Sequence, residues 1–311
     1  MQISGLGERA ADAPKSPALV ERLADPSERV QAILLLAPTA LLLGLIVVYP
    51  IARLVYNSFF DLRLSGGAVA PFVGLENYVL VLQDRQFWNA LWNTLLVTVI
   101  TVVGALVVGL ALALLANLPY RIKWPVRLAL LLPWAMPLAF AGLIFAWFFN
   151  TDYGVVNDWA VRLGLEPRQW LLDPRTAFGA VCLAIIWKSS SFIALILLAG
   201  LQMIPRSLYE AAEVDGATRL QQFREVTLPL LVPSIVVALI FRTITALQTF
   251  DIPYTMTKGG PAHATETLAM LIHSTTIDYG DIGYGSALAV LMFLLSMVVT
   301  ALYLRRIQRD S

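Results

Sequence analysis

The 311-residue sequence is poor in charged side chains and has a single cysteine. Asp, Glu, Lys and Arg make up 14% of the residues, whereas an ordinary soluble domain carries about 25%. The lone Cys182 cannot form an intrachain disulfide, and the net charge of +1 gives no basis for nucleic-acid binding. Hydrophobic residues make up 58% of the chain, so the composition predicts a membrane protein.

The sequence also lacks the residue patterns that would indicate catalysis. None of its four lysines follows a glycine, so it has no Gly-Lys pair of a P-loop, whose backbone cradles phosphates while the lysine neutralises them. HExxH, CxxC, Ser-His-Asp and Cys-His patterns are missing as well. With no cysteine or carboxylate at the spacing of a ligand set, we interpret His263 and His273 as surface residues. The chain is therefore not expected to be an enzyme.

Long apolar segments are what the sequence has in abundance. Six of them reach the roughly 20 residues that a spanning helix needs, near residues 31–56, 90–117, 126–149, 177–203, 229–250 and 285–304. Lipid offers the backbone no hydrogen bonds, so these segments must be helical. We expect an all-α integral membrane protein with about six transmembrane helices. Pro133 and Pro137 predict a kink in the third span, and Ala105 and Gly109 predict close helix packing.

The distribution of Lys and Arg indicates the orientation. Thirteen of them fall on the side that holds both termini, and six fall on the other side. Because positive residues favour the cytoplasm, both termini and the loop at about residues 205–228 are predicted to be cytoplasmic. Residues 1–30 are predicted to be a cytoplasmic tail with an amphipathic helix near residues 19–30, and residues 31–311 the transmembrane domain.

The cytoplasmic loop has more local order than its position requires. Ser207 and Glu210 form a Ser-x-x-Glu capping box, which predicts a helix that starts just after Pro205. Gly216 predicts a tight or left-handed turn, and a second short helix is expected from Ala217 to about Val226. One interpretation is an ordinary surface helix in which Glu210 only completes the cap.

The same loop resembles a known signature. Glu210-Ala211-Ala212 is followed four residues later by Gly216 and, after nine more residues, by Val226-Thr227-Leu228-Pro229. This is similar to the EAA motif of binding-protein-dependent ABC importer permeases, and Asp215-Gly216-Ala217 resembles the wording of the carbohydrate-importing branch. The resemblance implies a coupling helix that docks into a cleft of a separate ATPase subunit. The implied docking residues are Leu208, Tyr209, Glu210, Ala211, Ala212, Asp215, Gly216 and Ala217.

The resemblance also implies a set of partners. ATP and Mg²⁺ would be bound by an ATPase dimer, so no cofactor is expected on this chain. A second homologous permease is expected because the dimer has two clefts and this chain has one coupling loop. A solute-binding protein would deliver the solute from outside, and lipid would surround a multi-pass permease of the cytoplasmic (inner) membrane.

Three cations, Arg53, Lys188 and Arg242, are predicted to lie within spans, and the last two are considered for the substrate path. A Lys or Arg at mid-bilayer costs about 2.5–3.5 kcal/mol, so Lys188 and Arg242 should face a cavity or a partner. Lys188, Ser189 and Phe192 share one helical face, and a cation, a hydroxyl and an aromatic ring suit a sugar. By resemblance to the maltose-importer permease, the substrate path comprises Lys188, Ser189, Phe192, Arg242, Thr245, Ala246 and Thr249. Ser191 departs from the family, which often has proline there.

Structural alternatives remain open for these residues. Lys188 and Arg242 could pair with Asp251 or with a partner subunit, and Asp251 could instead cap a helix. Trp134, Trp147 and Tyr153 could be aromatic residues of the membrane interface or contact the substrate. In the outer loop, residues 257–261 are predicted to form a turn, followed by an amphipathic helix from Thr265 to about Asp278.

The leading hypothesis is a permease subunit of an ATP-driven ABC importer that moves a di- or trisaccharide into the cytoplasm by alternating access. A permease for glycerol phosphate or a polyol is the alternative within this class. A stand-alone secondary transporter is the alternative from another class. It is disfavoured because the sequence shows no clear repeat and no acidic residue deep in a span. A membrane enzyme is a weaker third interpretation.

Overall fold

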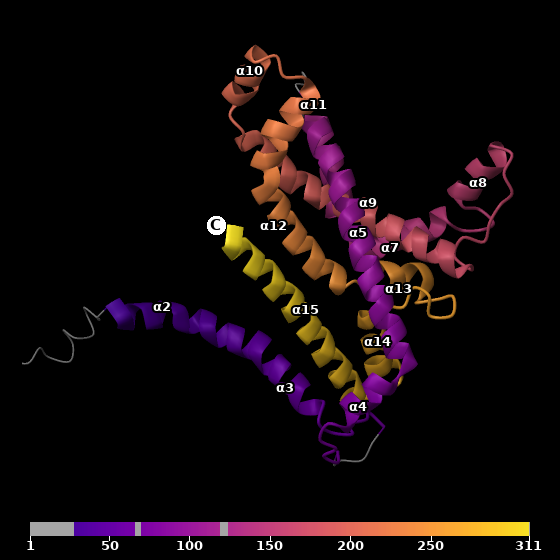
Figure 1. Cartoon of the computed structure of the whole chain (residues 1–311). Helices are drawn as coiled ribbons and strands as arrows, with labels where there is room; N and C mark the ends of the chain where they lie inside the picture. Colours follow the sequence, from indigo (N-terminus) through magenta and orange to yellow (C-terminus); the bar gives the residue numbers. More distant parts are fainter. Residues whose placement is uncertain (1–27, 66–69, 119–123, 311) are drawn as a thin grey trace, which may run out of the picture. The chain divides into compact units, whose positions relative to one another are not determined.

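The computed structural model describes residues 28–65, 70–118 and 124–310, and within them the chain is helical (Figure 1). Isolated bridges, such as the one between Phe60 and Phe72, are the sole β pairings among these residues. The chain divides into two units, residues 1–53 and 54–311. The predicted cytoplasmic tail lies outside the described residues except for its last three, which begin the first helix.

The first unit is described from Glu28 onward. It contains α2 (Glu28–Leu43), the π-helical turn η1 (Gly44–Val48) and the start of α3 (Tyr49–Asn57). These elements form one helix from Val30 to Asn57, whose 28 residues exceed the length needed to cross a hydrocarbon core of about 30 Å. The first predicted span is confirmed.

Four more helices are long and apolar enough to span. They are α5 (Arg85–Asn117), α9 (Pro174–Met203), the helix from Arg219 to Leu247 that ends in α12 (Leu228–Leu247), and α15 (Ile282–Asp310). In α15, the part that is apolar enough to span runs from Ile282 to Tyr303. The short α4 (Glu76–Gln83) precedes α5. These helices confirm the second, fourth, fifth and sixth predicted spans.

The third predicted span is wrong as a single kinked helix. It consists of α6 (Trp124–Ala135) and α7 (Leu138–Phe148), which meet at an angle of 96°. Pro133 is accommodated inside α6, but Pro137 disfavours helical geometry at Met136 and lacks the N–H that would continue the helix. Two prolines four residues apart therefore break the helix, and among the described residues the total reaches six spans only if the bent pair counts as one.

The core of the second unit lies where α5 packs against α9. Gly109 allows this approach, because a Cβ there would lie only 2.7 Å from Cγ2 of Ile193. Ala105 is fully buried one turn earlier on α5, as the predicted small-residue pair requires. On α9, Ile193 and Leu197 fill the same apolar cluster. This close contact fixes the helix that carries Lys188.

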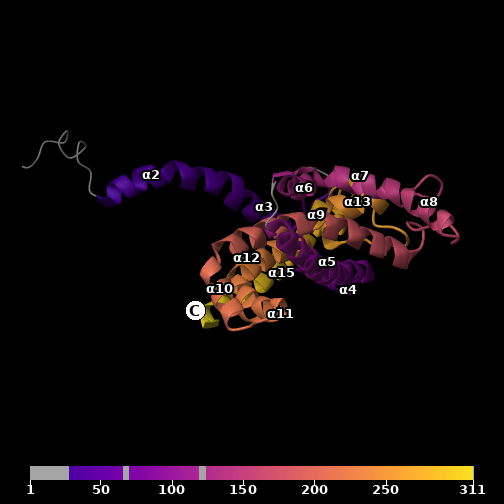
Figure 2. The same cartoon turned by 90° about the horizontal axis from the view of Figure 1, so that it is seen from above.

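Short helices gather at the two ends of α9 (Figures 1 and 2). At its C-terminal end lie α10 (Arg206–Val214), α11 (Arg219–Gln222) and the π-helical turn η2 (Phe223–Thr227). Near the opposite end lie α8 (Val155–Arg162) and α13 (Asp251–Thr257), while α14 (Leu268–His273) and the π-helical turn η3 (Ser274–Asp278) pack against α15. The outer-loop helix is confirmed, although it begins at Leu268 because Thr267 caps it, and the sequence did not predict α13.

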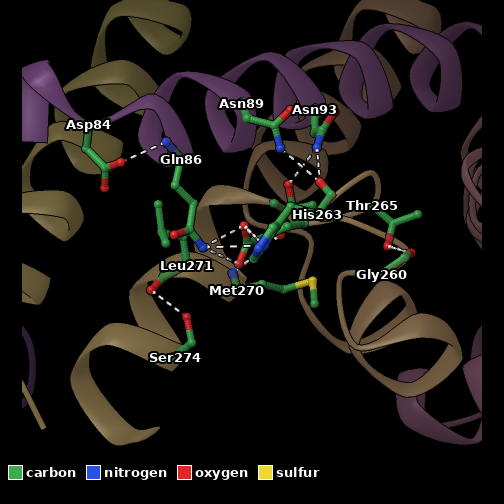
Figure 3. Close-up of polar contacts among 12 residues, drawn as sticks. Asp84, Gln86, Asn89, Asn93, Gly260, His263, Thr265, Met270, Leu271 and Ser274 are labelled. Atoms are coloured by element: carbon green, nitrogen blue, oxygen red, sulfur yellow. Dashed lines mark hydrogen bonds and ion pairs between the residues drawn. The ribbon is translucent and has the colours of Figure 1, made fainter. Parts of the chain in front are cut away.

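A cluster that we call the polar clamp fastens the loop that contains His263 and Glu266 to the start of α5 (Figure 3). Gln86 Nε2 donates to the two carboxylate oxygens of the buried Glu266 at 3.1 and 3.0 Å. Asn89 Nδ2 donates to the His263 carbonyl at 2.9 Å, and Asn93 Nδ2 donates to the carbonyls of His263 and Glu266 at 3.0 and 3.1 Å.

The two histidines differ from each other in their surroundings. His263 Nδ1 lies 2.9 Å from Glu266 Oε2 while its side chain is 60% exposed, as expected for a surface residue. His273 is partly buried, and its ring packs against Phe250 and Tyr254, so the prediction of a surface position is wrong for it. Among the described residues, no group of three or more His, Cys, Asp and Glu could hold a metal ion.

Candidate functional site

A cavity of about 220 Å³ opens where α9 and α12 pass the break between α6 and α7. The beginning of α13 completes its wall. Its lining residues are Trp134, Leu138, Ile185, Lys188, Ser189, Phe192, Arg242, Thr245, Gln248, Thr249, Phe250, Asp251 and Ile252. Cations, hydroxyls, an amide, a carboxylate and aromatic rings therefore face one space.

Six of the seven residues of the predicted substrate path line this cavity. Lys188, Ser189 and Phe192 come from α9, and Arg242, Thr245 and Thr249 come from α12 and the turn after it. Ala246 is the exception, since it is fully buried in the packing of α12 and does not line the cavity. Regular helix geometry explains the grouping, because residues three, four and seven apart share a face.

Lys188 binds to the broken helix. Its Nζ donates to the carbonyl of Trp134 at 2.8 Å. Trp134 lies in the last turn of α6, whose terminal carbonyls have lost their helical donors because the helix stops at Ala135. A cation at the C-terminus of a helix also compensates its negative dipole end. Lys188 therefore stabilises the break that shapes the cavity.

Arg242 is held by hydroxyl groups. It is only 6% exposed, and its Nη2 donates to Oγ1 of Thr101 at 2.7 Å while Nη1 donates to Oγ1 of Thr245 at 3.3 Å. Its Nε has no hydrogen-bond partner among the described residues. Thr101 belongs to α5 and sequence reasoning missed it. The signal was the polar stripe of Asn93, Thr94, Thr98 and Thr101, all buried on one long apolar helix.

The predicted alternative that Asp251 pairs with these cations is wrong. Within the described parts of the chain, no carboxylate oxygen lies within 4.0 Å of Lys188 or Arg242. Asp251 lines the same cavity as the first residue of α13, where a carboxylate favours the positive end of the helix dipole. Pairing of either cation with another subunit stays a prediction.

The aromatic residues named from the sequence separate into two groups. Trp134 lines the cavity, whereas Trp147 and Tyr153 do not and are exposed elsewhere. Phe192 packs edge-to-face against Phe241 at 6.4 Å between ring centroids. Sequence reasoning missed the lining residues Gln248 and Phe250, because both lie inside the predicted fifth span but after the observed end of α12 at Leu247, where helical spacing no longer applies.

α9 is unbroken at Ser191, the position where this sequence departs from the pattern that it resembles. The helix runs from Pro174 to Met203, and the buried hydroxyl of Ser191 donates to the carbonyl of Leu130 in α6. Leu130 lies four residues before Trp134, so Ser191 and Lys188 both bind carbonyls of the same helix. Together they fix α6 against α9 beside the cavity.

The coupling segment, residues 205–228, forms a helix, a glycine turn and a second helix, but its caps differ from those predicted. The capping box at Ser207 and Glu210 is wrong, since α10 begins at Arg206 with Pro205 as its N-cap. A capping box instead joins Thr218 and Gln221 at the start of α11. Because Glu210 does not cap the helix, capping does not explain why a glutamate stands at this position.

Gly216 ends α10 as predicted, with a φ of +77°. The N–H of Ala217 donates to the carbonyl of Ala212 at 2.9 Å, and the N–H of Gly216 donates to that of Glu213 at 3.1 Å. This pair of bonds is a Schellman motif, which glycine permits at low cost. The predicted second helix is not separate, because α11 continues through η2 into α12.

The residues of α10 divide into an exposed side and an anchor. The Glu210 side chain is 66% exposed and pairs with Arg206 at 3.5 Å, and Leu208, Ala211, Asp215 and Gly216 are exposed as well. Tyr209 is partly buried, and its hydroxyl lies 3.0 Å from Oγ1 of the buried Thr227 in η2. Ala212 and Ala217 are partly buried. The helix therefore presents one face outward while Tyr209 ties it to the start of α12.

Comparison with known proteins gives a family and close relatives. The family described as "Binding-protein-dependent transport system inner membrane component" matches residues 105–310, which is more than half of the chain. The sulfoquinovosyl glycerol transport system permease protein SmoG of Agrobacterium fabrum is 65% identical over 92% of this chain and 93% of its own length. The trehalose/maltose transport system permease protein MalF of Thermococcus litoralis is 42% identical over 77% and 82%.

A solved structure shows the same fold. A chain of a bacterial ABC transporter involved in the import of the acidic polysaccharide alginate has a TM-score of 0.79, with 24% identity over 90% of this chain and 95% of that chain. The family also shows the role of each subunit. This chain is a multi-pass transport subunit, and ATP hydrolysis belongs to a separate subunit. The chain belongs to the inner membrane components of binding-protein-dependent transport systems, the permeases of ABC importers.

Proposed function

We propose that this permease carries a glycoside into the cytoplasm by alternating access, and that the cavity at the α6–α7 break is the place where the solute binds. The glycoside is a di- or trisaccharide, or one sugar joined to a small polyol. The observation that carries the proposal is the lining of the cavity, where cations, hydroxyls and aromatic rings converge at a helix break.

The chemistry of the lining suits a sugar. The hydroxyls of Ser189 and Thr249 and the amide of Gln248 can exchange hydrogen bonds with sugar hydroxyls. The rings of Trp134 and Phe192 offer apolar faces of the kind that cover the C–H side of a pyranose. A small number of polar groups on a mainly apolar wall is typical of a site that orients one ligand.

The named relatives support a glycoside. One is named for sulfoquinovosyl glycerol and the other for trehalose and maltose, and each of these solutes contains a glycosidic bond. Identity of 65% over almost the whole chain favours a solute that shares the sugar-plus-glycerol size of the first. Our proposal therefore includes glycosides of glycerol beside the di- and trisaccharides.

We assign the exposed side of α10 as the ATPase-docking surface. Leu208, Glu210 and Ala211 are exposed there, and no cap or buried ion pair accounts for Glu210. In this proposal an ATPase dimer binds α10 and its counterpart on a second homologous permease, and a solute-binding protein docks on the outer side. Both termini and α10 then face the cytoplasm.

The helix from Arg219 to Leu247 suggests how docking is coupled to the cavity. Its beginning is tied to α10 through Tyr209 and Thr227, and its end carries Arg242 and Thr245. A push on α10 during closure of the ATPase dimer therefore moves one continuous helix, which displaces the cavity wall. Hydrolysis of ATP allows the helix to return.

Glu210→Ala tests the docking assignment in the reconstituted complex with its second permease, ATPase and binding protein. We expect solute-stimulated ATPase activity and uptake to fall at least tenfold. Expression should stay normal, because the ion pair that Glu210 loses with Arg206 is exposed and therefore weak. Glu213→Ala is the matched control, because Glu213 is also exposed on α10 but is not one of the residues that match the motif.

Normal coupled uptake by Glu210→Ala would remove the docking role. Gradient-driven uptake by the chain alone would favour a secondary transporter instead. A panel of neutral and anionic glycosides, assayed for stimulation of the ATPase, tests the proposed solute class.

A further inference from the structure

The cavity holds two buried cations, and no described carboxylate oxygen lies within 4.0 Å of either, although Asp251 lines the same cavity. Lys188 donates to a carbonyl, and Arg242 donates to two threonine hydroxyls. Both side chains are less than a tenth exposed. Removing a charge from water is costly unless an opposite charge or several hydrogen bonds compensate it. Neutral acceptors alone leave this cost partly uncompensated, so both positions favour an anion.

Arg242 keeps a free donor in this arrangement. A guanidinium group has five N–H donors arranged as a planar fork, which matches the oxygens of carboxylate and phosphate groups. Thr101 and Thr245 accept from its two terminal nitrogens, but the buried Nε has no partner among the described residues. A buried donor without an acceptor costs free energy, so its retention on a cavity wall points to a ligand that supplies the acceptor.

The helix break adds to the positive potential. α7 has 11 residues and begins at Leu138, which lines the cavity. Its N-cap is Pro137, which provides no side-chain acceptor, so the first N–H groups of α7 lack a cap. The same break brings Lys188 to Trp134. Asp251 is the sole carboxylate in the lining.

We propose that this cavity selects a glycoside that carries an anionic group, a sulfonate, phosphate or carboxylate, and that Arg242 and Lys188 bind that group. The inference rests on the proposed function and narrows its solute class. Arg242 offers the anion the guanidinium N–H groups that the two threonines leave unused, and Lys188 lines the same cavity from the neighbouring helix α9. Asp251 accepts hydrogen bonds from hydroxyls of the sugar, which keeps it away from the anion. The permease itself then rejects neutral glycosides.

The test compares two solutes that differ in one group, glucosyl glycerol and its 6-sulfonated form. Their binding is measured on the purified complex of both permeases and the ATPase dimer in lipid nanodiscs. The solute-binding protein is left out, so that its own preference does not contribute. We expect the sulfonated glycoside to bind at least tenfold more tightly.

Arg242→Gln should reduce that preference to less than threefold, and Arg242→Lys should restore part of it. Arg162→Gln is the control, since it removes the same charge from an exposed pair with Asp158 on α8. The preference should persist in this control. Should Arg242→Gln fail to assemble, Lys188→Met is measured with the same expectation, because it also deletes one cation of the pair.

Each contrary outcome has a different meaning. Equal binding of the two glycosides by the unmodified complex would overturn the anion site and leave the proposed function intact. An equal loss of both solutes in Arg242→Gln, with lower thermal stability, would also overturn it and assign Arg242 to helix packing. Binding of neither glycoside by an active complex would overturn the proposed function and the anion site together.

Discussion

The cavity and the polar clamp each bury charged groups, but they satisfy them differently. In the clamp, the carboxylate of Glu266 accepts from Gln86 with both oxygens and lies within hydrogen-bond distance of His263. In the cavity, Arg242 retains a buried N–H without a partner, and Lys188 has only a carbonyl. The clamp is closed within the chain, whereas in the cavity neither cation forms an ion pair with a described carboxylate.

This difference distinguishes a structural cluster from the binding site that we propose. A fully paired polar cluster rigidifies the fold, because each group holds another in place. An incompletely paired cluster in a cavity lowers stability, so it persists where a ligand uses it. We therefore expect substitutions in the cavity to impair transport with little loss of stability, and substitutions in the clamp to do the reverse.

The largest effect on transport is expected for Lys188→Ala. Removal of the cation deletes a hydrogen bond from a charged donor and half of the proposed anion site, so uptake should fall by at least tenfold. Stability should change by about 1 kcal/mol or less, because the desolvation cost of the buried cation disappears with it. Uptake into proteoliposomes and thermal unfolding of the same purified complex measure the two effects.

Lys188→Arg serves as the control, since it keeps the charge and a donor for the Trp134 carbonyl. Full uptake by Lys188→Ala, or a large loss of stability with uptake unchanged per folded complex, would show that Lys188 only holds α6 against α9. Either result would erase the distinction between the two clusters.

The opposite pattern is expected for Asn93→Leu in the clamp. The substitution keeps the side-chain size but removes the donor for the carbonyls of His263 and Glu266. Asn93 is buried, so the carbonyl oxygens lose a partner that water cannot easily replace, and stability should fall by about 2 kcal/mol. The preference for a sulfonated over a neutral glycoside should stay within twofold of the unmodified value.

Asn89→Leu is the matched control on the same face of α5. Asn89 is exposed and donates to the His263 carbonyl only, so its loss should cost less than half as much. Equal effects of the two substitutions on unfolding would mean that burial does not govern the clamp. A change in solute preference in Asn93→Leu would mean that clamp and cavity are not independent.

The spans could be predicted because hydropathy acts on single segments. Five of the six long apolar stretches became single helices, and the glycine turn at Gly216 followed from local backbone freedom. The sequence predicted only a kink at Pro137, whereas the helix is broken there. The size of the bend depends on Lys188 and Ser191 of α9, which bind carbonyls of α6. The cap at Ser207 was mistaken because α10 already begins at Arg206, and its N-cap Pro205 lies two residues before the predicted cap.

Residues of the cavity could be grouped from the sequence only when they lie on the same helix. Helical spacing found Arg242, Thr245 and Thr249 on one face of the fifth span. Thr101 could not be paired with Arg242 from the sequence, because 141 residues separate them. The clamp was missed for the same reason, as Asn93 and Glu266 lie 173 positions apart.

The smallest effect is expected at a third kind of polar site, the exposed N-cap of α9. Backbone N–H groups of Thr176 and Arg175 hold the pKa of the Asp173 carboxyl below its ordinary value of 3.8. A lowered pKa in the folded state means that the carboxylate stabilises the fold above about pH 4 and loses this contribution as the pH falls through the folded-state pKa. Solvent screens an exposed group, so the contribution is small.

Asp173→Asn keeps an acceptor for the same N–H groups and removes only the charge. At pH 7 the unfolding midpoint of the complex should drop by about 1 °C or less. The difference between the two proteins should shrink further as the pH is lowered from 7 to 4, because protonation begins to remove the charge from the unmodified protein as well. A difference that grows toward pH 4, or a loss as large as that of Asn93→Leu, would contradict the view that burial decides how much a paired polar group contributes.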